Sequence, residues 1–298
     1  MQTSDVIIHI GYPKVASSWL QRCVFIPAHG FQTPWATHSN AAIEHFVHTP
    51  LPFFNAEIIR NDFLAACAPS AGAPVISHEA LAGDPIRGSY GGFEAVRRLA
   101  ETFPGARLVV FVRTQESYAY SAWCEHVRRG GLTSINAYLD DKDVAPGYRP
   151  FCPPEFLRYN ELIGYCAELF GHERVLALPL EAMASGKVLN HLSAFLDNEK
   201  LLEAANERVY RSLSGGTTRI LRQLNRFAPY DPTQRDGRGF LLRQSARLDR
   251  HAPKAWQYRC KKGDQKKIAA LLSGRYAEAN RELQALTPID LSQFTYQL

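Results

Sequence analysis

The sequence predicts an α/β fold, in which a parallel β-sheet is flanked by helices on both faces. Short β-branched runs alternate with segments of helical periodicity between Val6 and Leu178, and such alternation is typical of a parallel sheet. The first run ends in Gly11-Tyr12-Pro13, a turn that leads into a helical segment. A strand, a turn and a helix in this order predict a core like that of phosphate-binding-loop (P-loop) proteins.

Four strands are expected, because four short apolar runs are bounded by turn residues. They are Val6–Ile10, Pro74–His78, Ala106–Val112 and Arg174–Leu178. Helical spacing predicts helices over Ser17 to about Phe25, Phe93–Phe103, Thr114–Arg129 and Pro154–Phe170. Beyond Glu181 the pattern is mainly helical, so we expect one domain over residues 1–298 with a mainly helical C-terminal part.

Composition narrows the class of protein. The chain has 298 residues, of which 46% are hydrophobic, and Lys and Arg exceed Asp and Glu by 34 to 29, which favours an anionic ligand without implying nucleic acid. No apolar stretch approaches the roughly 18 residues of a transmembrane helix, and the N-terminus lacks signal-peptide features, so a cytoplasmic location is expected. The six cysteines form no C-x-x-C pair and the histidines no ligand spacing, so we expect no metal.

The turn after the first expected strand predicts an anion-binding site. Unpaired amides at a helix N-terminus favour an anion, Lys14 adds a positive charge, and Ser17 and Ser18 add hydroxyl donors. The nucleoside-triphosphate loop is G-x-x-x-x-G-K-[ST], in which a hydroxyl residue directly follows the lysine. Here Val15 follows Lys14, which counts against an ATP or GTP enzyme.

The turn resembles the 5′-phosphosulfate-binding loop of sulfotransferases that use 3′-phosphoadenosine 5′-phosphosulfate (PAPS), especially bacterial and carbohydrate-type members. That loop is usually written Y-P-K-[TS]-G-[TS]-[TS]-[WL], and this chain has Tyr12-Pro13-Lys14 followed by Ser17-Ser18-Trp19. The chain departs from the pattern at Val15 and Ala16. Alanine at the glycine position is tolerable in a right-handed backbone and costly at positive φ. The resemblance implies donor contacts from Lys14, Ala16, Ser17, Ser18 and Trp19.

A second motif follows the third expected strand, where Ser121 lies eight residues after Arg113. In the sulfotransferase family, an arginine and a serine at this spacing bind the 3′-phosphate of the donor. An arginine can direct two donors onto a phosphate, and Ser121 lies two turns into the next helix on the same side. The segment Tyr276–Leu283 is similar to the Y-x-x-x-N-x-x-L of bacterial and carbohydrate-type members, and Lys261-Lys262-Gly263 resembles a basic loop near the 3′-phosphate.

Sulfuryl transfer to a hydroxyl needs a cation for the departing phosphate and a base for the acceptor proton. Lys14 suits the first role. For the base we favour Glu79, with His78 as the alternative, because Ser77-His78-Glu79 lies at the C-terminal end of the second expected strand. Ser77-x-Glu79 resembles carbohydrate-type sulfotransferases, which place a catalytic glutamate near this location, whereas cytosolic small-molecule members use a histidine. Strand alternation would direct these two side chains to opposite faces. The structural alternative is that Glu79 pairs with an arginine and His78 packs in the core.

Together the motifs predict a sulfotransferase that moves the sulfuryl group of PAPS to an acceptor hydroxyl and releases 3′-phosphoadenosine 5′-phosphate (PAP). A carbohydrate hydroxyl is the leading acceptor, and a tyrosyl or small-molecule hydroxyl is the alternative. Two other functions stay open. A nucleotide kinase would require ATP and magnesium, and a non-catalytic relative would bind anions or sugars without transfer.

Overall fold

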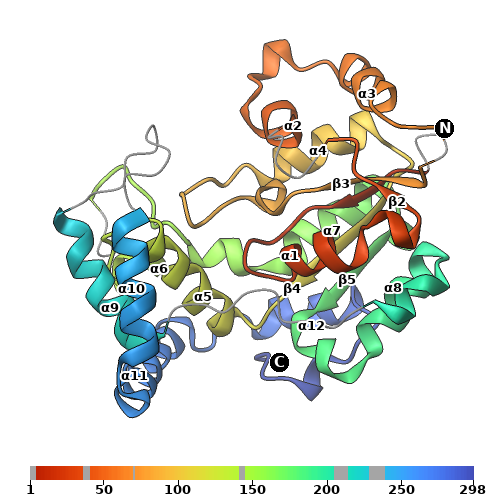
Figure 1. Ribbon diagram of the computed structural model, residues 1–298. Coiled ribbons are helices and arrows are strands. Elements are labelled where there is room, and N and C mark those ends of the chain that lie inside the picture. Colours follow the sequence, from red (N-terminus) through yellow and green to blue (C-terminus); the bar gives the residue numbers. More distant parts are fainter. Residues whose placement is uncertain (1–4, 36–40, 70, 141–144, 205–213, 228–238) are drawn as a thin grey trace.

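The computed structural model describes residues 5–35, 41–69, 71–140, 145–204, 214–227 and 239–298; of residues 239–241 only the backbone is described. At its centre is a five-stranded sheet in the order β2-β3-β1-β4-β5, in which every neighbouring pair is parallel (Figure 1). The strands are β1 (Ile7–His9), β2 (Phe31–Gln32), β3 (Ala73–Ser77), β4 (Arg107–Val112) and β5 (Val175–Pro179). The predicted α/β class is confirmed.

The four predicted strands are β1, β3, β4 and β5, and each observed bound lies within one residue of the expected one. All three residues of β1 are buried, because this strand is central and helices cover both of its faces. This explains why its sequence is a continuous apolar run rather than an alternating one. Strand β2 was not predicted, since two residues carry no detectable period.

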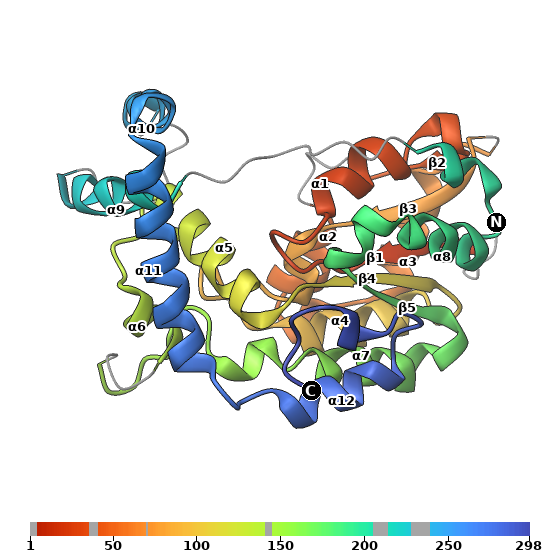
Figure 2. The ribbon, with the colours of Figure 1, turned by 90° about the horizontal axis from the view of Figure 1, so that it is seen from below.

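Helices cover both faces of the sheet. Figure 2 shows α1 and α8 on one face and α4, α7 and α12 on the opposite face. The α-helices before β5 are α1 (Ser17–Trp19), α2 (Ala41–Ile43), α3 (Ala56–Ala65), α4 (Gly92–Thr102), α5 (Gln115–Arg128), α6 (Ile135–Leu139) and α7 (Tyr159–Phe170). Those after β5 are α8 (Lys187–Leu196), α9 (Gly215–Leu224), α10 (Gly239–His251), α11 (Lys254–Leu272) and α12 (Ala277–Ala285).

Several helices differ from the regular α type. The first continues as a π-helix, η2 (Leu20–Val24), and the predicted helix 154–170 begins with a separate 3₁₀ turn, η8 (Pro154–Leu157). A second π-helix is η4 (Glu44–His48). The other 3₁₀ turns are Pro27–His29, Leu51–Phe53, Glu79–Ala82, His172–Arg174, Leu180–Ser185, Glu199–Glu203, Asn225–Phe227 and Leu291–Gln293.

A group of helices lies beside the sheet and packs on α5. Helices α6, α9, α10 and α11 gather at the left of Figures 1 and 2, and α11 contacts α5, α6 and α9. The two glycines that begin α9 allow close packing on α11. A Cβ added at Gly215 would lie 2.4 Å from the backbone nitrogen of Lys261, and one added at Gly216 would lie 2.3 Å from the ring of Trp256. Among the helices of the described ranges, none combines the length and apolar character that crossing a membrane requires.

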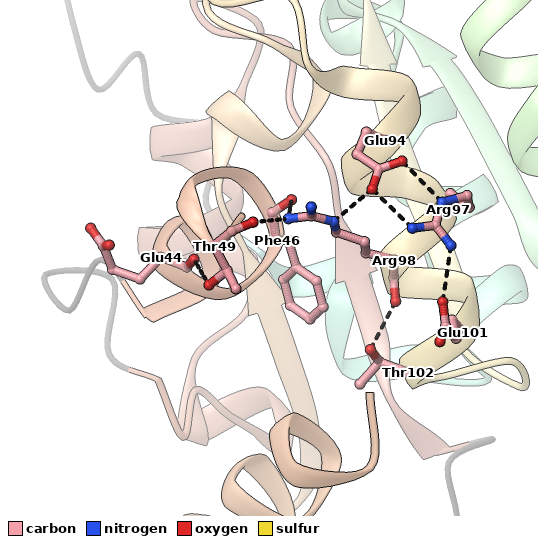
Figure 3. Close-up of polar contacts among 8 residues, drawn as sticks. All are labelled: Glu44, Phe46, Thr49, Glu94, Arg97, Arg98, Glu101 and Thr102. Carbon is pink, nitrogen blue, oxygen red and sulfur yellow. Dashed lines mark hydrogen bonds and ion pairs between the residues drawn. The ribbon is translucent and has the colours of Figure 1, made fainter. Parts of the chain in front are cut away.

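A network of polar contacts joins α4 to the segment that contains η4 (Figure 3). Arg98 is buried and donates through Nη1 to the carbonyl oxygens of Thr49, at 2.7 Å, and Phe46, at 3.4 Å. Its Nε donates to Oε1 of Glu94 at 2.8 Å. Because Arg98 pairs with these two carbonyls, the segment before α3 can pack on α4 without leaving them unpaired.

Candidate functional site

The predicted site residues follow three neighbouring strands at the carboxyl edge of the sheet. The turn from Gly11 follows β1, His78 and Glu79 follow β3, and Arg113 follows β4. The chain passes from β1 to β2 and β3 on one side and then crosses to β4 and β5 on the other. Strand order therefore reverses at β1, and open parallel sheets bind ligands at such a point.

Gly11 brings the turn into contact with the backbone that follows β3. Its φ is 103°, and an added Cβ would lie 2.2 Å from the carbonyl oxygen of Glu79. A side chain at this position would collide with that carbonyl and would also have to adopt a conformation that L-residues rarely take. Glycine therefore allows the first motif and the candidate base to lie side by side.

Side chains in the turn alternate between the core and the surface. Val15 is fully buried in the hydrophobic core, whereas Lys14, Ala16 and Ser18 are partly exposed. Ser17 is buried, and its hydroxyl donates to a backbone carbonyl of the turn at 3.4 Å. The absence of a hydroxyl at Val15 therefore removes no group from the exposed surface of the turn.

Ala16 occupies the position where the sulfotransferase pattern has glycine, and its backbone is left-handed, with φ 56° and ψ −5°. This is the costly case, because a left-handed conformation costs a non-glycine residue roughly 1 kcal/mol. The carbonyl oxygen of Ala16 accepts from the backbone N–H groups of Trp19 and Leu20, at 2.9 Å each. The first helix thus starts at a strained residue, and Lys14 earlier in the turn also has positive φ, 66°.

Trp19 supports the turn from the core side. Its ring is 4% exposed and meets Phe111 of β4 edge to face, with 6.2 Å between ring centroids. Its backbone N–H already donates to Ala16. Tyr12 is buried in the same way, against Phe156 and Tyr159. These aromatic residues anchor the turn, and the Trp19 ring does not face its exposed surface.

Lys14 forms an ion pair that sequence reasoning missed. Its Nζ lies 3.3 Å from Oε2 of Glu125 on α5. Glu125 also accepts hydrogen bonds from Arg128, whose Nε lies 2.8 Å from Oε2, and from Arg129, whose Nε lies 3.0 Å from Oε1. Three cations and one carboxylate leave this cluster with a net charge of +2. The arginines could have been found from their i+3 and i+4 spacing, but the Lys14 contact could not.

Glu125 is ionised in the folded chain although it is buried. Burial by itself raises the pKa of its carboxyl group, but the hydrogen bonds from Arg128 and Arg129 and the charges of Lys14 and Arg128 outweigh burial and lower the pKa to about 2. The carboxylate is therefore negative at any pH at which the protein would be assayed, and the cluster keeps its net positive charge.

Arg113 lies at the other end of the same face of α5. Its Nε donates to Oγ of Ser117 at 2.8 Å, and Ser121 follows one turn later, 5% exposed. Residues four apart differ by about 40° around a helix, so Ser117, Ser121 and Glu125 form one row within about 80°. This row, which we call the α5 row, runs about 12 Å along the helix axis between Ser117 and Glu125. It connects Arg113 at one end with Lys14 at the other.

The turn between β4 and α5 is held by the C-terminal part of the chain. The backbone N–H of Thr114 donates to Oε1 of Glu181 at 3.1 Å, and the hydroxyl of Tyr296 donates to Oε2 of the same carboxylate at 3.2 Å. Gln115 donates to Oδ1 of Asn280 on α12 at 2.6 Å. Asn280 of the C-terminal motif is therefore a buried residue that supports the start of α5.

The segment Lys261-Lys262-Gly263 lies inside α11, so the loop implied by its resemblance is wrong. Cys260, Asp264 and Ile268 are buried at helical spacing. Their packing keeps this segment helical although its sequence resembles the basic loop. Lys261 still lies close to the α5 helix, with its Nζ 6.0 Å from the ring centroid of Tyr120.

His78 and Glu79 are both half-buried, but strand alternation does not separate them, because β3 ends at Ser77 and Glu79 opens the 3₁₀ turn Glu79–Ala82. Nδ1 of His78 accepts the backbone N–H of Ala80 at 3.1 Å. A backbone N–H can only donate, so the neutral ring carries its proton on Nε2. Burial lowers the pKa of His78, which keeps the ring neutral. Neither ring nitrogen is then ready to accept a proton.

The remaining candidate ligands are packed or dispersed. His9 is fully buried, its Nδ1 lies 2.8 Å from Oγ of Ser77, and burial, followed by the nearby His78, lowers its pKa to about 3. All six cysteines are free thiols. Within the described ranges, no group of three or more His, Cys, Asp or Glu side chains could hold a metal ion.

The chain is similar in structure to a sulfotransferase from Alicyclobacillus acidocaldarius that has been solved by crystallography. The TM-score is 0.48, the sequence identity is 14%, and the alignment covers 96% of this chain and 97% of the other. No protein-family model matches the chain, and no curated protein matches it in sequence. A similarity at 14% identity assigns no role to any residue of this chain.

Proposed function

We propose that the chain is a sulfotransferase that transfers the sulfuryl group of PAPS to an acceptor hydroxyl. One observation carries the proposal: the α5 row connects two cationic side chains, Arg113 and Lys14, at the carboxyl edge of the sheet. A ligand with two separate anionic groups suits this arrangement. A nucleotide with a 5′-phosphosulfate and a 3′-phosphate is such a ligand, and the turn and the Arg113–Ser121 spacing resemble the two family motifs that bind these groups.

The donor would bind with its two anionic groups at opposite ends of the α5 row. Lys14 and Ser18 are partly exposed residues of the turn, and they would contact the 5′-phosphosulfate, Lys14 by its charge and Ser18 by its hydroxyl. Arg113 and Ser121 would bind the 3′-phosphate, and Ser117 would orient the guanidinium through its bond to Nε. Ala16 and Ser17 would shape the turn beneath the phosphosulfate.

The reaction needs no covalent intermediate. The acceptor oxygen attacks the sulfur atom, and the bond from sulfur to the bridging phosphate oxygen breaks. Glu79 takes the proton of the acceptor hydroxyl, and Lys14 offsets the charge that develops on the departing phosphate oxygen. The products are a sulfated acceptor and PAP.

Glu79 is preferred to His78 as the base because a hydrogen bond already occupies the His78 ring. Nδ1 of His78 is occupied by the backbone of Ala80, and its Nε2 carries the proton. Glu79 is half-buried, and its backbone lies against the turn at Gly11, which supports Glu79 as the residue beside the proposed phosphosulfate site. His78 would instead hold the backbone on which Glu79 sits.

A carbohydrate hydroxyl is the acceptor that we propose first, on the basis of the resemblance of Ser77-x-Glu79 to carbohydrate-type members. The C-terminal motif adds little to this choice, because Asn280 is buried in contacts that stabilise the fold. A tyrosyl or small-molecule hydroxyl is the alternative acceptor. A nucleotide kinase is disfavoured, because Val15 follows Lys14 where a magnesium-binding hydroxyl is needed.

Donor binding can be tested by calorimetry with PAP on the wild type and on the Lys14→Ala and Arg113→Ala variants. Each variant should bind PAP about 10-fold to 100-fold more weakly, because each loses a charged hydrogen-bond donor. Arg97→Ala, which removes a cation on α4, is the matched control and should bind like the wild type. Tighter binding of ADP with magnesium than of PAP would favour a kinase and contradict the proposal.

Transfer can be tested with labelled PAPS and a panel of glycans, tyrosyl peptides and phenols. Glu79→Gln should lower turnover about 100-fold or more while PAP affinity stays within about 2-fold. His78→Gln should retain far more activity than Glu79→Gln. Wild-type protein that binds PAP but labels no acceptor would instead indicate the non-catalytic relative.

A further inference from the structure

Glu125 is a buried carboxylate at the proposed donor site that the proposed reaction does not use. Its side chain is 6% exposed, and that of its partner Lys14 is 24% exposed. A negative group beside the cation that should bind a phosphosulfate opposes anion binding by simple electrostatics. Anion binding therefore does not explain why a carboxylate lies beside Lys14.

The contacts of Glu125 show that it is the fixed member of the pair. Both of its carboxylate oxygens accept hydrogen bonds from Arg128, the last residue of α5, and Oε1 also accepts one from Arg129, the next residue. Lys14, by contrast, carries its ammonium on a flexible four-carbon stem, which loses much rotamer entropy when it is held. The carboxylate therefore offers an anchored acceptor, 3.3 Å from the Lys14 ammonium, on a rigid helix.

We propose that Glu125 is a positioning residue that holds the Lys14 ammonium in place for transfer and lowers donor affinity in doing so. The proposal rests on the proposed function. A cation already fixed where charge develops needs no reorganisation during the reaction. The cost is electrostatic, because the cluster has a net charge of +2 with the carboxylate and would have +3 without it.

The Glu125→Gln variant separates positioning from general damage to the site. Glutamine keeps the size of the side chain and removes its charge. PAP should bind about 3-fold to 10-fold more tightly, because a negative charge near the anion is gone. Turnover should fall about 10-fold or more, because Lys14 is no longer held. A site damaged by misfolding would instead lose affinity and turnover together.

Whether Lys14 is held can be tested without donor or acceptor. An amine-reactive reagent labels the Lys14 side chain, and mass spectrometry of the peptide that contains Lys14 gives the labelling rate. An ammonium held against a carboxylate is labelled slowly. In Glu125→Gln the Lys14 rate should rise about 3-fold or more, whereas Lys187, which contacts Gln293 elsewhere on the chain, should be unchanged. Glu125→Asp keeps the charge on a shorter side chain. In this variant the labelling rate of Lys14 should lie between those of the wild type and Glu125→Gln, and PAP affinity should stay within about 2-fold of the wild type.

Glu94→Gln is the matched control, since Glu94 also pairs with arginines at i+3 and i+4. It should change neither Lys14 labelling, PAP affinity nor turnover. An unchanged Lys14 rate in Glu125→Gln, or equal losses of affinity and turnover, would refute the positioning role. Absence of PAP binding to the wild type would refute the proposed function instead, while the labelling rate would still decide whether Glu125 holds Lys14. If Glu125→Gln does not fold, the Glu125→Asp labelling rate decides: a rate equal to the wild type contradicts the proposal.

Discussion

Glu94 on α4 and Glu125 on α5 have almost the same local pattern and very different surroundings. Each accepts hydrogen bonds from arginines three and four residues further along the chain. Each has a pKa lowered to about 2: at Glu94 chiefly by the hydrogen bond from Arg97, and at Glu125 by its cationic neighbours in spite of burial. Local sequence alone would assign them the same role.

The charge around each carboxylate distinguishes them. On α4, Arg97 and Arg98 are balanced by Glu94 and Glu101, and Nη1 of Arg98 also donates to two backbone carbonyls (Figure 3). Around Glu125 the arrival of Lys14 from the β1 turn leaves two positive charges in excess, at the carboxyl edge of the sheet. A balanced network serves packing, whereas an excess of charge at a strand-end turn suits an anionic ligand.

The largest expected effect is on acid stability. Because folding lowers the pKa of Glu125 from 4.5 to about 2, its ionisation stabilises the fold by about 3 kcal/mol above pH 4.5, and this contribution disappears as the pH falls through 2. Urea unfolding measures the difference in unfolding free energy between the wild type and Glu125→Gln. This difference should be about half as large at pH 3 as at pH 6. Glu94 is 44% exposed, so Glu94→Gln should show a much smaller change. Parallel pH profiles for the wild type and Glu125→Gln would contradict this assignment.

The next effect concerns the balanced network. Arg98→Ala should lower the free energy of unfolding by about 2 kcal/mol, because it leaves the carbonyls of Thr49 and Phe46 without their donor. PAP affinity should stay within about 2-fold, since α4 lies outside the proposed donor site. A large loss of affinity in a folded Arg98→Ala protein would show that the two clusters are not separate in function.

A smaller effect of opposite sign is expected in the turn beside Lys14. Ala16→Gly should raise the free energy of unfolding by about 0.5 kcal/mol, because glycine adopts φ 56° without strain but loses more entropy on folding. Chemical denaturation measures the change. Destabilisation by Ala16→Gly would indicate that the alanine methyl group makes packing contacts worth more than the strain.

The smallest effect is expected for Arg97→Ala. Arg97 is 38% exposed and its partners Glu94 and Glu101 are 44% and 51% exposed, so its ion pairs are screened by water. The loss of stability should be below about 0.5 kcal/mol in thermal or urea unfolding. If Arg97→Ala were as damaging as Arg98→Ala, burial would not be what separates the two arginines.

Much of the fold could be predicted from the sequence, but less of the site. The four longer strands were predicted because their β-branched runs end in turn residues, and α5 because its period is regular. The two-residue β2 and the π-helical continuation of α1 carry no such local signal. At the site, Lys14 and Arg113 could be singled out from motif spacing, whereas Ser117 as the contact of Arg113 and Glu125 as the contact of Lys14 could not.

The sequence by itself determined the strand-turn-helix at Gly11 and the eight-residue spacing from Arg113 to Ser121, because both depend on neighbours along the chain. Only the tertiary structure decided that Glu125 meets Lys14, that Gly11 lies against Glu79, and that Ala16 must be left-handed. The physical reason is that such contacts depend on strand order. Placing β1 between β3 and β4 brings together groups that lie far apart in the chain, and only packing of the whole sheet selects that order.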